Sequence, residues 1–389
     1  YINMSINIQL DSSTTNFPQS KKNIESLIGK SVKVNNTKNG GLVKFSMTNN
    51  AITHAVNVLK TVIEHNKIIE LGDNKKLIIG KHLASGTYGK VYNGTLYKDD
   101  IPHKVVIKQQ EIRKSLEDKS IILEILINIL LKTDKILFRF VPKYYGSYKI
   151  DNSISIISEF VSSSTYDDLI QQVRKQSVQQ ANNVISSIYL QVLLTLNVMQ
   201  HRYNFVHGDL KTNNLMVLPT NQKKFTINGR QFNPHGYTFK YIDFGFSCMT
   251  SYTQSKIHVP HYYSDNICGK KHIDTMFLSI HLLFDLERFK LTDLPIYTFL
   301  KNKLDKFLKF AKIKRAKYIS VSNKIVNGNT YNNSKMFKND YNKAKGHIGY
   351  ELLRSTLPLS NKTAGFDVFH PDKLYVDFVK DMGFNVVKV

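Results

Sequence analysis

Strand-like apolar runs fill the first part of the chain, and apolar residues at helical spacing dominate after about residue 162. Residues 50–70 carry apolar positions at helical spacing and predict one helix. Apolar stretches around 115–132 and at 184–200 predict two more helices, the second buried on most sides. Runs typical of strands are separated by glycine-containing and polar turns, and they cover residues 75–85, 89–97, 103–112, 143–150 and 153–161.

Strands followed by helices predict an α+β protein with two segregated parts. We expect residues 1–73 to form a partly ordered N-terminal extension with one helix, residues 74–161 a small β-rich part, and residues 162–389 a larger, mainly helical part. Two polar segments, 218–237 and 313–347, are predicted to be insertions. NGRQF within the first of them indicates an added hairpin.

Composition agrees with a globular protein that has anionic partners. The 389 residues are 42% hydrophobic, which argues against wholesale disorder, and the net charge is +24. Such a charge favours nucleotides, nucleic acid, acidic proteins or anionic lipid as partners. An AT-rich genome would produce the same lysine-rich, asparagine-rich composition without a binding site. No basic motif interleaved with aromatic residues supports nucleic-acid binding as the main function.

Targeting signals and cysteines favour an intracellular, reducing compartment. The chain has only two cysteines, which excludes a fold built on disulfides. Its first residues do not resemble a secretory signal peptide. The most apolar run, 120–131, is too short to span a bilayer. We therefore expect a cytoplasmic protein that is not secreted.

A glycine-containing turn and two charges in apolar segments are the first candidates for chemistry. Residues 83–92, LASGTYGKVY, place small residues between two strands, where backbone N–H groups can approach an anion. Lys108 ends the apolar run VVIK, and Glu124 lies midway along an apolar helix. Because an unpaired charge is costly to bury, we expect these two side chains to meet each other and a phosphate.

The segment FVHGDLKTNNLMV, 205–217, concentrates polar residues between apolar flanks. Asp209 and Asn214 lie five residues apart with Lys211 between them, and Asp243 follows a strand-like run and precedes a glycine. Oxygens of Asn214 and Asp243 are the hard ligands that Mg²⁺ prefers when it also binds phosphates. Asp209 would accept the proton of an attacking hydroxyl. Lys211 would neutralise a transferring phosphoryl group.

In this order the segments resemble the eukaryotic-type protein kinase family, over about residues 74–312. The family order is a glycine-rich loop, a strand lysine, a helix glutamate, a catalytic loop and Asp-Phe-Gly, and the chain has ASGTYGKV, VVIK, Glu124, HGDLKTNN and DFG. The resemblance implies a two-lobed kinase fold and transfer of the γ-phosphoryl group of ATP, with Mg²⁺ or Mn²⁺, to serine or threonine hydroxyls of protein substrates. It makes Asp209 the catalytic base, Lys108 with Glu124 the holder of the α- and β-phosphates, and Asn214 and Asp243 the metal ligands.

The resemblance also assigns supporting and nucleotide-binding positions. Ser158 takes the gatekeeper position, His207 is a structural prop, and Asp274 anchors the catalytic loop. Lys211 is more typical of serine/threonine kinases than of tyrosine kinases. The residues expected to contact ATP besides Lys108 are Leu83, Ala84, Ser85, Gly86, Thr87, Tyr88 and Gly89 in the hairpin, Val91, Val106 and Met216 around the adenine ring, and backbone groups of Glu159 and Val161.

Several positions depart from the family pattern. Ala84 replaces the first glycine of the hairpin, and Val106 replaces the usual alanine above adenine. Asn128 stands where the family has an apolar residue, so either the helix register differs or the regulatory stack is weakened. Gly208 replaces the arginine that normally meets a phosphorylated activation loop, so that switch loses its receptor. No Ala-Pro-Glu follows Asp243, which puts the peptide-docking floor in doubt.

Two alternative functions stay open on the sequence alone. HGDL also resembles the aminoglycoside and choline kinases, which phosphorylate small molecules. A non-catalytic pseudokinase scaffold would have lost Lys108, Asp209 or Asp243, and this chain has all three. The asparagine-rich, lysine-rich composition resembles kinases of large DNA viruses, which places the protein in the host cytoplasm or the virion. A zinc site built from Cys248, His258, His261 and Cys268 is a further possibility, although the spacing fits no compact finger.

Overall fold

The computed structural model describes most of the residues in the kinase-like motifs. The described residues are 4–9, 32–36, 42–47, 68–71, 75–86, 89–111, 118–150, 153–161, 164–250, 256–257, 272–310 and 368–389. Most of the predicted helix at 50–70 and all of the predicted insertion at 313–347 lie outside them. The chain divides into two compact units, which we call the N-terminal unit (1–162, 202–204 and 243–268) and the C-terminal unit (163–201, 205–242 and 269–389).

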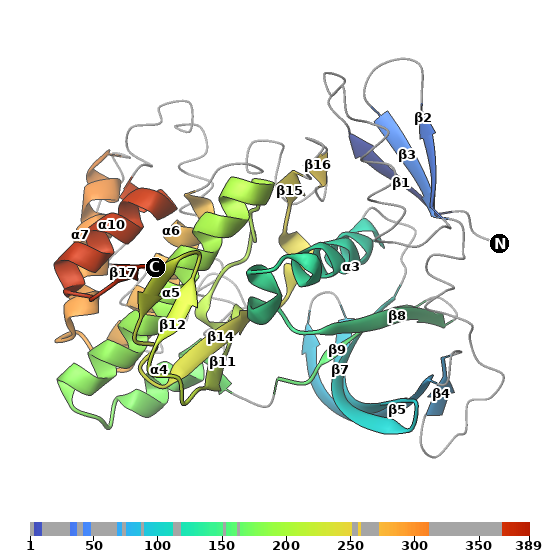
Figure 1. Ribbon diagram of the computed structural model, residues 1–389, viewed down its shortest axis with the longest axis horizontal. Helices are drawn as coiled ribbons and strands as arrows, with labels where there is room; N and C mark the ends of the chain where they lie inside the picture. The colour runs from blue at the N-terminus through green and yellow to red at the C-terminus, as the bar shows by residue number, and fades with distance from the viewer. Residues whose placement is uncertain are drawn as a thin grey trace, which may run out of the picture. The chain divides into compact units, whose positions relative to one another are not determined.

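A six-stranded antiparallel sheet dominates the N-terminal unit (Figure 1). Its order is β4-β5-β6-β7-β9-β8, with the bounds β4 Ile68–Glu70, β5 Lys75–Gly86, β6 Gly89–Lys98, β7 Ile101–Glu111, β8 Tyr144–Ile150 and β9 Ser153–Glu159. Five of these strands were predicted from the sequence. The helix predicted for 50–70 was wrong at its end, because Ile68 and Ile69 pair across the sheet with Ile78 and Leu77. Helical spacing alone does not distinguish a short apolar run from a strand.

The two faces of this sheet differ in chemistry. One face carries a buried apolar cluster that includes Leu77, Val105, Ile107 and Ile157. Since successive side chains along a strand point to opposite faces, Val106 and Lys108 lie on the other face of β7. The pattern of the strand therefore sends a lysine to the face opposite the apolar cluster.

Helix α3, Asp118–Thr133, packs beside β8 and ends at a short 3-10 turn, η1, Leu137–Phe140. The carboxylate of Asp134 joins the two, because it accepts hydrogen bonds from the backbone N–H groups of Ile136 and Leu137. It also accepts hydrogen bonds from Arg202 Nη1 and the Tyr203 hydroxyl, each at 2.7 Å. Asp134 thus fixes the turn after α3 to the end of a helix that is distant in sequence.

A second antiparallel sheet of the N-terminal unit was not predicted. It has the order β15-β16-β1-β3-β2, with the bounds β1 Met4–Gln9, β2 Val32–Asn36, β3 Leu42–Met47, β15 Met249–Thr250 and β16 Lys256–Ile257. Residues 1–49 show weak periodicity in the sequence, so their strands escaped the prediction.

Helices form most of the described part of the C-terminal unit. They are α4 Tyr166–Val173, α5 Val178–Tyr203, α6 Ile273–Arg288, α7 Pro295–Phe310 and α10 Pro371–Met382. The last residues of α5 cluster with the N-terminal unit. The helix predicted at 184–200 is α5, and it starts earlier because Ser177 and Gln180 form reciprocal side-chain-to-backbone hydrogen bonds typical of a capping box. No helix in the described part of the chain is both long and apolar enough to cross a membrane.

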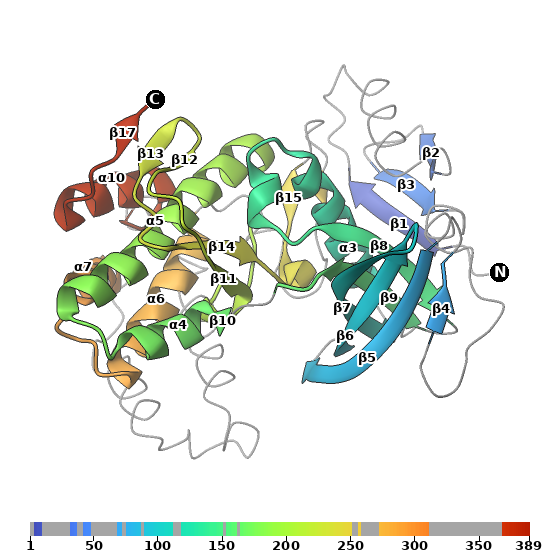
Figure 2. The same cartoon turned by 60° about the horizontal axis from the view of Figure 1, so that its bottom comes forward.

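Two three-stranded sheets complete the C-terminal unit (Figure 2). One has the order β10-β11-β14 (Ser164–Thr165, Leu215–Pro219 and Tyr237–Tyr241), and the other has the order β12-β13-β17 (Phe225–Ile227, Arg230–Phe232 and Val387–Lys388). The hairpin predicted from NGRQF is confirmed as β12–β13. Its turn residues Asn228 and Gly229 have φ of 48° and 71°, as a tight two-residue turn requires. The predicted α+β class, with β structure first and helices later, is also confirmed.

Candidate active site

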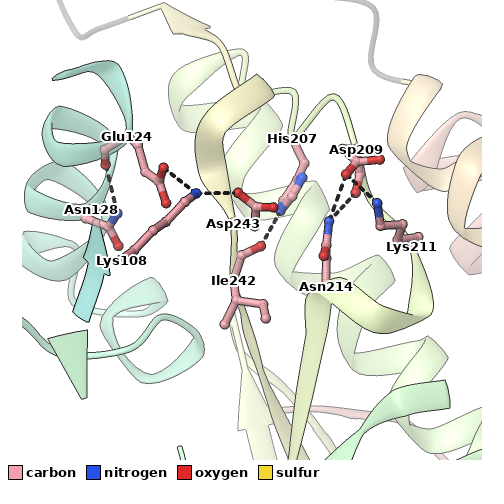
Figure 3. Close-up of polar contacts among 9 residues, drawn as sticks. All are labelled: Lys108, Glu124, Asn128, His207, Asp209, Lys211, Asn214, Ile242 and Asp243. Atoms are coloured by element: carbon pink, nitrogen blue, oxygen red, sulfur yellow. Dashed lines mark hydrogen bonds and ion pairs between the residues drawn. The ribbon is translucent and has the colours of Figure 1, made fainter. Parts of the chain in front are cut away.

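Lys108 lies between two carboxylates in the N-terminal unit (Figure 3). Its ammonium donates to Glu124 Oε2 at 2.8 Å and to Asp243 Oδ1 at 2.7 Å. The three residues come from β7, from α3 and from the segment after β14. The pairing of Lys108 with Glu124 was expected, whereas the direct contact with Asp243 was not. We call these three residues the ion triad.

Charge pairing determines the direction of the pKa shift at Lys108, whereas burial determines it at Glu124. Burial would lower the pKa of Lys108, but the Asp243 and Glu124 carboxylates more than offset this and raise its pKa above the ordinary value. Burial raises the pKa of Glu124, and the Lys108 ammonium opposes that shift. Lys108 therefore stays cationic at neutral pH. A fixed positive charge of this kind is suited to binding phosphate oxygens.

Asp243 has a backbone conformation that matches its position before a tight turn. Its φ is 65° and its ψ is 71°, in the left-handed region that aspartate tolerates better than most residues. The 3-10 turn η3, Phe244–Phe246, follows directly, and Phe244 is buried. The apolar anchor at 244 holds the turn, so the Asp243 carboxylate is directed to Lys108.

The loop after α5 in the C-terminal unit brings three predicted residues together (Figure 3). Lys211 Nζ donates to Asp209 Oδ2 at 2.7 Å, and Asn214 Nδ2 donates to the same oxygen at 3.1 Å and to the Asp209 carbonyl at 2.8 Å. Asp209 Oδ1 receives no hydrogen bond from a described residue. Because the nitrogen of Asn214 is directed to Asp209, its amide oxygen points away from that residue.

A buried carboxylate fixes the backbone of this loop. Asp274, in the first turn of α6, accepts from the N–H of His207 at 2.7 Å and from the N–H of Gly208 at 3.0 Å. Burial raises the pKa of Asp274, while His207 and these hydrogen bonds oppose the shift. His207 Nε2 lies 3.1 Å from the carbonyl oxygen of Ile242, so its imidazole supports the segment that leads to Asp243. Both residues have the supporting contacts that the sequence predicted.

Thr212 has a contact that the sequence reading missed. The Thr212 hydroxyl donates a hydrogen bond to Asp285 Oδ2 at 2.6 Å, and both residues are fully buried. From the sequence alone, Thr212 is expected to be a spacer. Its contact was not predicted, because Asp285 lies 73 residues away in α6. A buried aspartate in the apolar run of α6 was the available signal, since such a group needs a partner.

The remaining predicted nucleotide-binding residues lie in both units. Leu83, Ala84, Ser85, Gly86 and Gly89 belong to the β5–β6 hairpin, while Thr87 and Tyr88 lie outside the described residues. Glu159 ends β9 and its N–H donates to the carbonyl of Lys143, and Val161 is buried two residues later. Met216, in β11, belongs to the C-terminal unit.

Register places three of the predicted residues on one face of the six-stranded sheet. Val91 pairs with Lys108, and Val106 pairs with Ser158. Tyr92 packs on the apolar cluster of the opposite face, so the neighbouring Val91 lies on the same face as Val106 and Lys108. The apolar side chains of Val91 and Val106 thus lie on the same sheet face as the Lys108 ammonium. An apolar ring and phosphates of one ligand could contact this face together.

The cysteine and histidine residues considered for zinc do not form a site in the described part of the chain. Cys248 is buried. His258, His261 and Cys268 lie outside the described residues. Among the residues that the structure describes, no group of three or more His, Cys, Asp and Glu side chains is arranged to hold a metal ion.

Comparison with known proteins agrees with this geometry. The sequence model of the protein kinase domain matches residues 77–276, more than half of the chain. The chain belongs to the protein kinase family. The matched range contains the ion triad, the Asp209 loop and Asp274.

Curated relatives of this kinase chain are similar over part of their length. A probable kinase, 098L, of Invertebrate iridescent virus 3 is 32% identical over 28% of this chain and 21% of the relative. The serine/threonine-protein kinase pakH of Dictyostelium discoideum is 29% identical over 41% of this chain and 29% of the relative. The serine/threonine-protein kinase nekl-2 of Caenorhabditis elegans is 27% identical over 45% of this chain and 46% of the relative. The chain thus spans between about a fifth and a half of the length of these relatives.

A solved structure of the BubR1 kinase domain is also similar to this kinase chain. It is 21% identical with a TM-score of 0.36, over 49% of this chain and 52% of that one.

Proposed function

We propose that this kinase transfers the γ-phosphoryl group of ATP to serine or threonine hydroxyls of protein substrates, with Mg²⁺. The observation that carries the proposal is the Asp209 carboxylate. Its Oδ2 is occupied by Lys211 and Asn214, while Oδ1 has no partner among the described residues. One oxygen is therefore oriented by the protein and the other is available to accept a hydroxyl proton.

The donor atoms fit Mg²⁺ and a triphosphate. The carboxylate of Asp243 and the amide oxygen of Asn214 are hard oxygen ligands, and the side chain of Asp243 is 37% exposed. Lys108 supplies a fixed positive charge for phosphate oxygens, and Glu124 holds that charge in place. Bound Mg²⁺ would neutralise the charge that develops on the transferring group. Val91, Val106, Met216 and backbone groups of Glu159 and Val161 would bind the adenine ring.

Lys211 supports a serine or threonine acceptor. Its ammonium holds Asp209 Oδ2 at 2.7 Å, with its own side chain 23% exposed. At this position it would stabilise the negative charge shared between the acceptor oxygen and the phosphoryl group. Together the loop residues orient the hydroxyl, accept its proton and neutralise the charge, and the curated serine/threonine-kinase relatives support this assignment.

Regulation would differ from that of kinases operated by a phosphorylated activation loop. Gly208 has φ of 80°, in the region that strains any residue with a Cβ, and its N–H donates to Asp274. An arginine at 208 would have to adopt this strained conformation. We propose that residues 74–161 and 162–389 form the kinase domain, that residues 1–73 extend it, and that phosphate on the activation segment has no arginine receptor at 208.

Phosphorylation with radiolabelled ATP tests the proposal. We expect wild type to phosphorylate serine and threonine in a generic protein substrate, and Asp209→Asn to lose about 10²–10⁴ of the rate, because general-base catalysis contributes that much. Thermal-shift titration with Mg-ATP should show binding by both proteins. Equal rates for the two proteins would refute the role of Asp209, and phosphorylation of alcohol metabolites in place of protein would refute the substrate class.

A further inference from the structure

Two adjoining cavities in the C-terminal unit have no part in the proposed active site. Their volumes are about 680 Å³ and about 590 Å³. They share the lining residues Asn183, Lys223, Asn233 and His235, so they form one continuous depression. We call this depression the amide groove. It is lined by the first turns of α5, the 218–237 insertion and the residues after α10.

The insertion, whose purpose the kinase motifs do not explain, builds most of the amide groove. It supplies seven of the eleven residues around the larger cavity. Its backbone is tied down: the carbonyl of Tyr237 accepts from Gln191 Nε2 at 2.9 Å, and the N–H of Thr220 donates to the carbonyl of Gly236 at 2.8 Å. The N–H of His235 donates to Asn233 Oδ1 at 2.8 Å. The walls are therefore ordered before any ligand arrives, which lowers the entropic cost of binding.

The chemistry of the walls is uniform. Six asparagine and glutamine residues line the larger cavity and three more line the smaller one, which gives nine amides. Each amide offers both donors and acceptors. A peptide backbone in extended form also presents both, whereas a nucleic-acid backbone presents phosphate acceptors and few donors. Amide-rich walls of this kind favour an extended polypeptide over a nucleic acid.

The charge of the amide groove is positive. Lys223 and Lys224 are exposed at its rim, and among the described residues no aspartate or glutamate lines either cavity. On the neighbouring helix α10, Asp377 is paired with Lys303, Asp372 Oδ2 lies 3.2 Å from His201 Nε2, and Asp381 is exposed. Burial lowers the pKa of His235, so this ring is neutral at pH 7 and offers one donor and one acceptor. Two lysines among neutral polar groups complement carboxylates.

We infer that the amide groove docks an extended, glutamate- or aspartate-rich segment of the protein substrate. The amides would bond the backbone of the segment, and Lys223 and Lys224 would pair with its carboxylates. This inference rests on the proposed protein-kinase function, and it adds the class of substrate: proteins that carry an acidic stretch apart from the phosphorylated residue.

Direct binding tests the groove without reference to activity. The probe is a fluorescein-labelled peptide of alternating glutamate and serine, and fluorescence polarisation of the full chain measures its affinity. The double variant Lys223→Glu/Lys224→Glu should weaken binding about ten-fold, because each exposed ion pair lost contributes a few-fold and each reversed charge repels the peptide. Asn183→Asp should also weaken peptide binding. It keeps the Oδ1 acceptor for Gln179 Nε2 but adds a negative charge at a residue that lines both cavities.

A matched control separates the groove from the general basic surface. Lys98→Glu/Lys135→Glu changes the net charge equally at two exposed lysines of the N-terminal unit. Equal weakening by both double variants would overturn the proposal, because the peptide would then bind the overall charge. A labelled oligo-uridylate is the second probe. If the groove variant loses as much affinity for it as for the peptide, or more, the proposal is overturned, because the groove would then be a nucleic-acid site.

Kinetics then connect docking to the proposed function. A serine peptide with an acidic extension should show a higher kcat/KM than the same peptide with a glutamine extension. The Lys223→Glu/Lys224→Glu variant should lower kcat/KM for the acidic peptide about ten-fold and leave kcat/KM for the glutamine peptide unchanged. An equal kcat/KM for the two peptides, with binding intact, would overturn the docking role. If neither peptide is phosphorylated, the proposed function fails, while polarisation still reports on the groove.

Discussion

The Lys108 ammonium is held by two side-chain carboxylates, whereas Asp209 lies in a loop whose backbone is fixed by a buried carboxylate. The ion triad joins residues that are 16 and 135 positions apart through two contacts of 2.8 and 2.7 Å at one ammonium. In the Asp209 loop, by contrast, Asp274 holds two consecutive N–H groups. Removing one charged group therefore dismantles the first arrangement, but the second keeps its backbone path when Asp209 or Lys211 changes.

This difference separates two kinds of mutational effect. In the ion triad, positioning and charge reside in the same atoms, so stability and activity should change together. In the Asp209 loop, Asp274 holds the backbone, whereas Asp209 and Lys211 are the groups proposed to act on the substrate. Stability and activity should therefore change separately. Each prediction below tests one side of this contrast, from the largest effect to the smallest.

The largest effect is expected for Lys108→Met. The variant leaves Glu124 and Asp243 without their cation, so the phosphorylation rate should fall by about 10²–10³ and the protein should unfold at a lower temperature. Lys211→Met should lower the rate but leave thermal unfolding unchanged, and Lys104→Met, an exposed lysine on the same strand, should alter neither. If Lys211→Met destabilised the protein as much as Lys108→Met, the contrast would disappear.

Asp274→Asn should have the next largest effect. It replaces a carboxylate that accepts two backbone hydrogen bonds by an amide with one acceptor, which should cost about 2–3 kcal/mol of the free energy of unfolding in urea. Activity should fall as well, because the Asp209 loop loses its anchor. Asp293→Asn, at an exposed position, is the control. Unchanged stability in the Asp274 variant would show that the loop holds itself in place.

Asp134→Asn should cost about 1–2 kcal/mol at pH 7, because charge-assisted hydrogen bonds become neutral ones. Burial would raise the pKa of Asp134, but hydrogen bonds from Leu137, Tyr203, Ile136 and Arg202 lower it overall. A carboxyl with a depressed pKa stabilises the fold above its ordinary pKa and loses this contribution as the pH falls. The gap between wild type and variant should therefore close below about pH 4. A gap that does not vary with pH would contradict this origin.

The smallest effect is expected for Asn128→Leu. The Asn128 amide donates to the carbonyl of Glu124 one turn earlier and is buried. Since that helix still brings Glu124 to Lys108, its register is the one the motif order predicts. We expect the free energy of unfolding to change by less than about 1.5 kcal/mol and the rate to change little. A large loss of activity with normal stability would show that Asn128 has a role in the ion triad.

The sequence predicted contacts where a charge interrupts an apolar pattern. Lys108 in a strand and Glu124 in a helix each required a partner, and the structure joins them. The same argument applied to Asp285 would have found Thr212, but nothing local identifies a partner 73 residues away. Asp134 follows a helix in a polar stretch, so neither its burial nor its bonds to Arg202 and Tyr203 were visible.

The amide groove was also beyond the sequence. Asparagine and glutamine residues of the insertion are typical of a solvated loop, and only the fold shows that they line the same depression as the first turns of α5. Long-range strand pairing was hidden for a similar reason. Residues 387–388 form too short a run to carry a strand signal, yet they extend the predicted hairpin by one strand.

That added strand has a consequence for synthesis of the chain on the ribosome. Strand β13 emerges early, but its partner β17 lies at residues 387–388, so about 160 residues must be made before Arg230 meets Lys388. At about 5–20 residues per second, this leaves an open strand edge for on the order of ten seconds. Open edges pair with other chains. Newly made protein is therefore exposed to misassembly at this strand until residues 387–388 have been made, and slower translation would lengthen that interval.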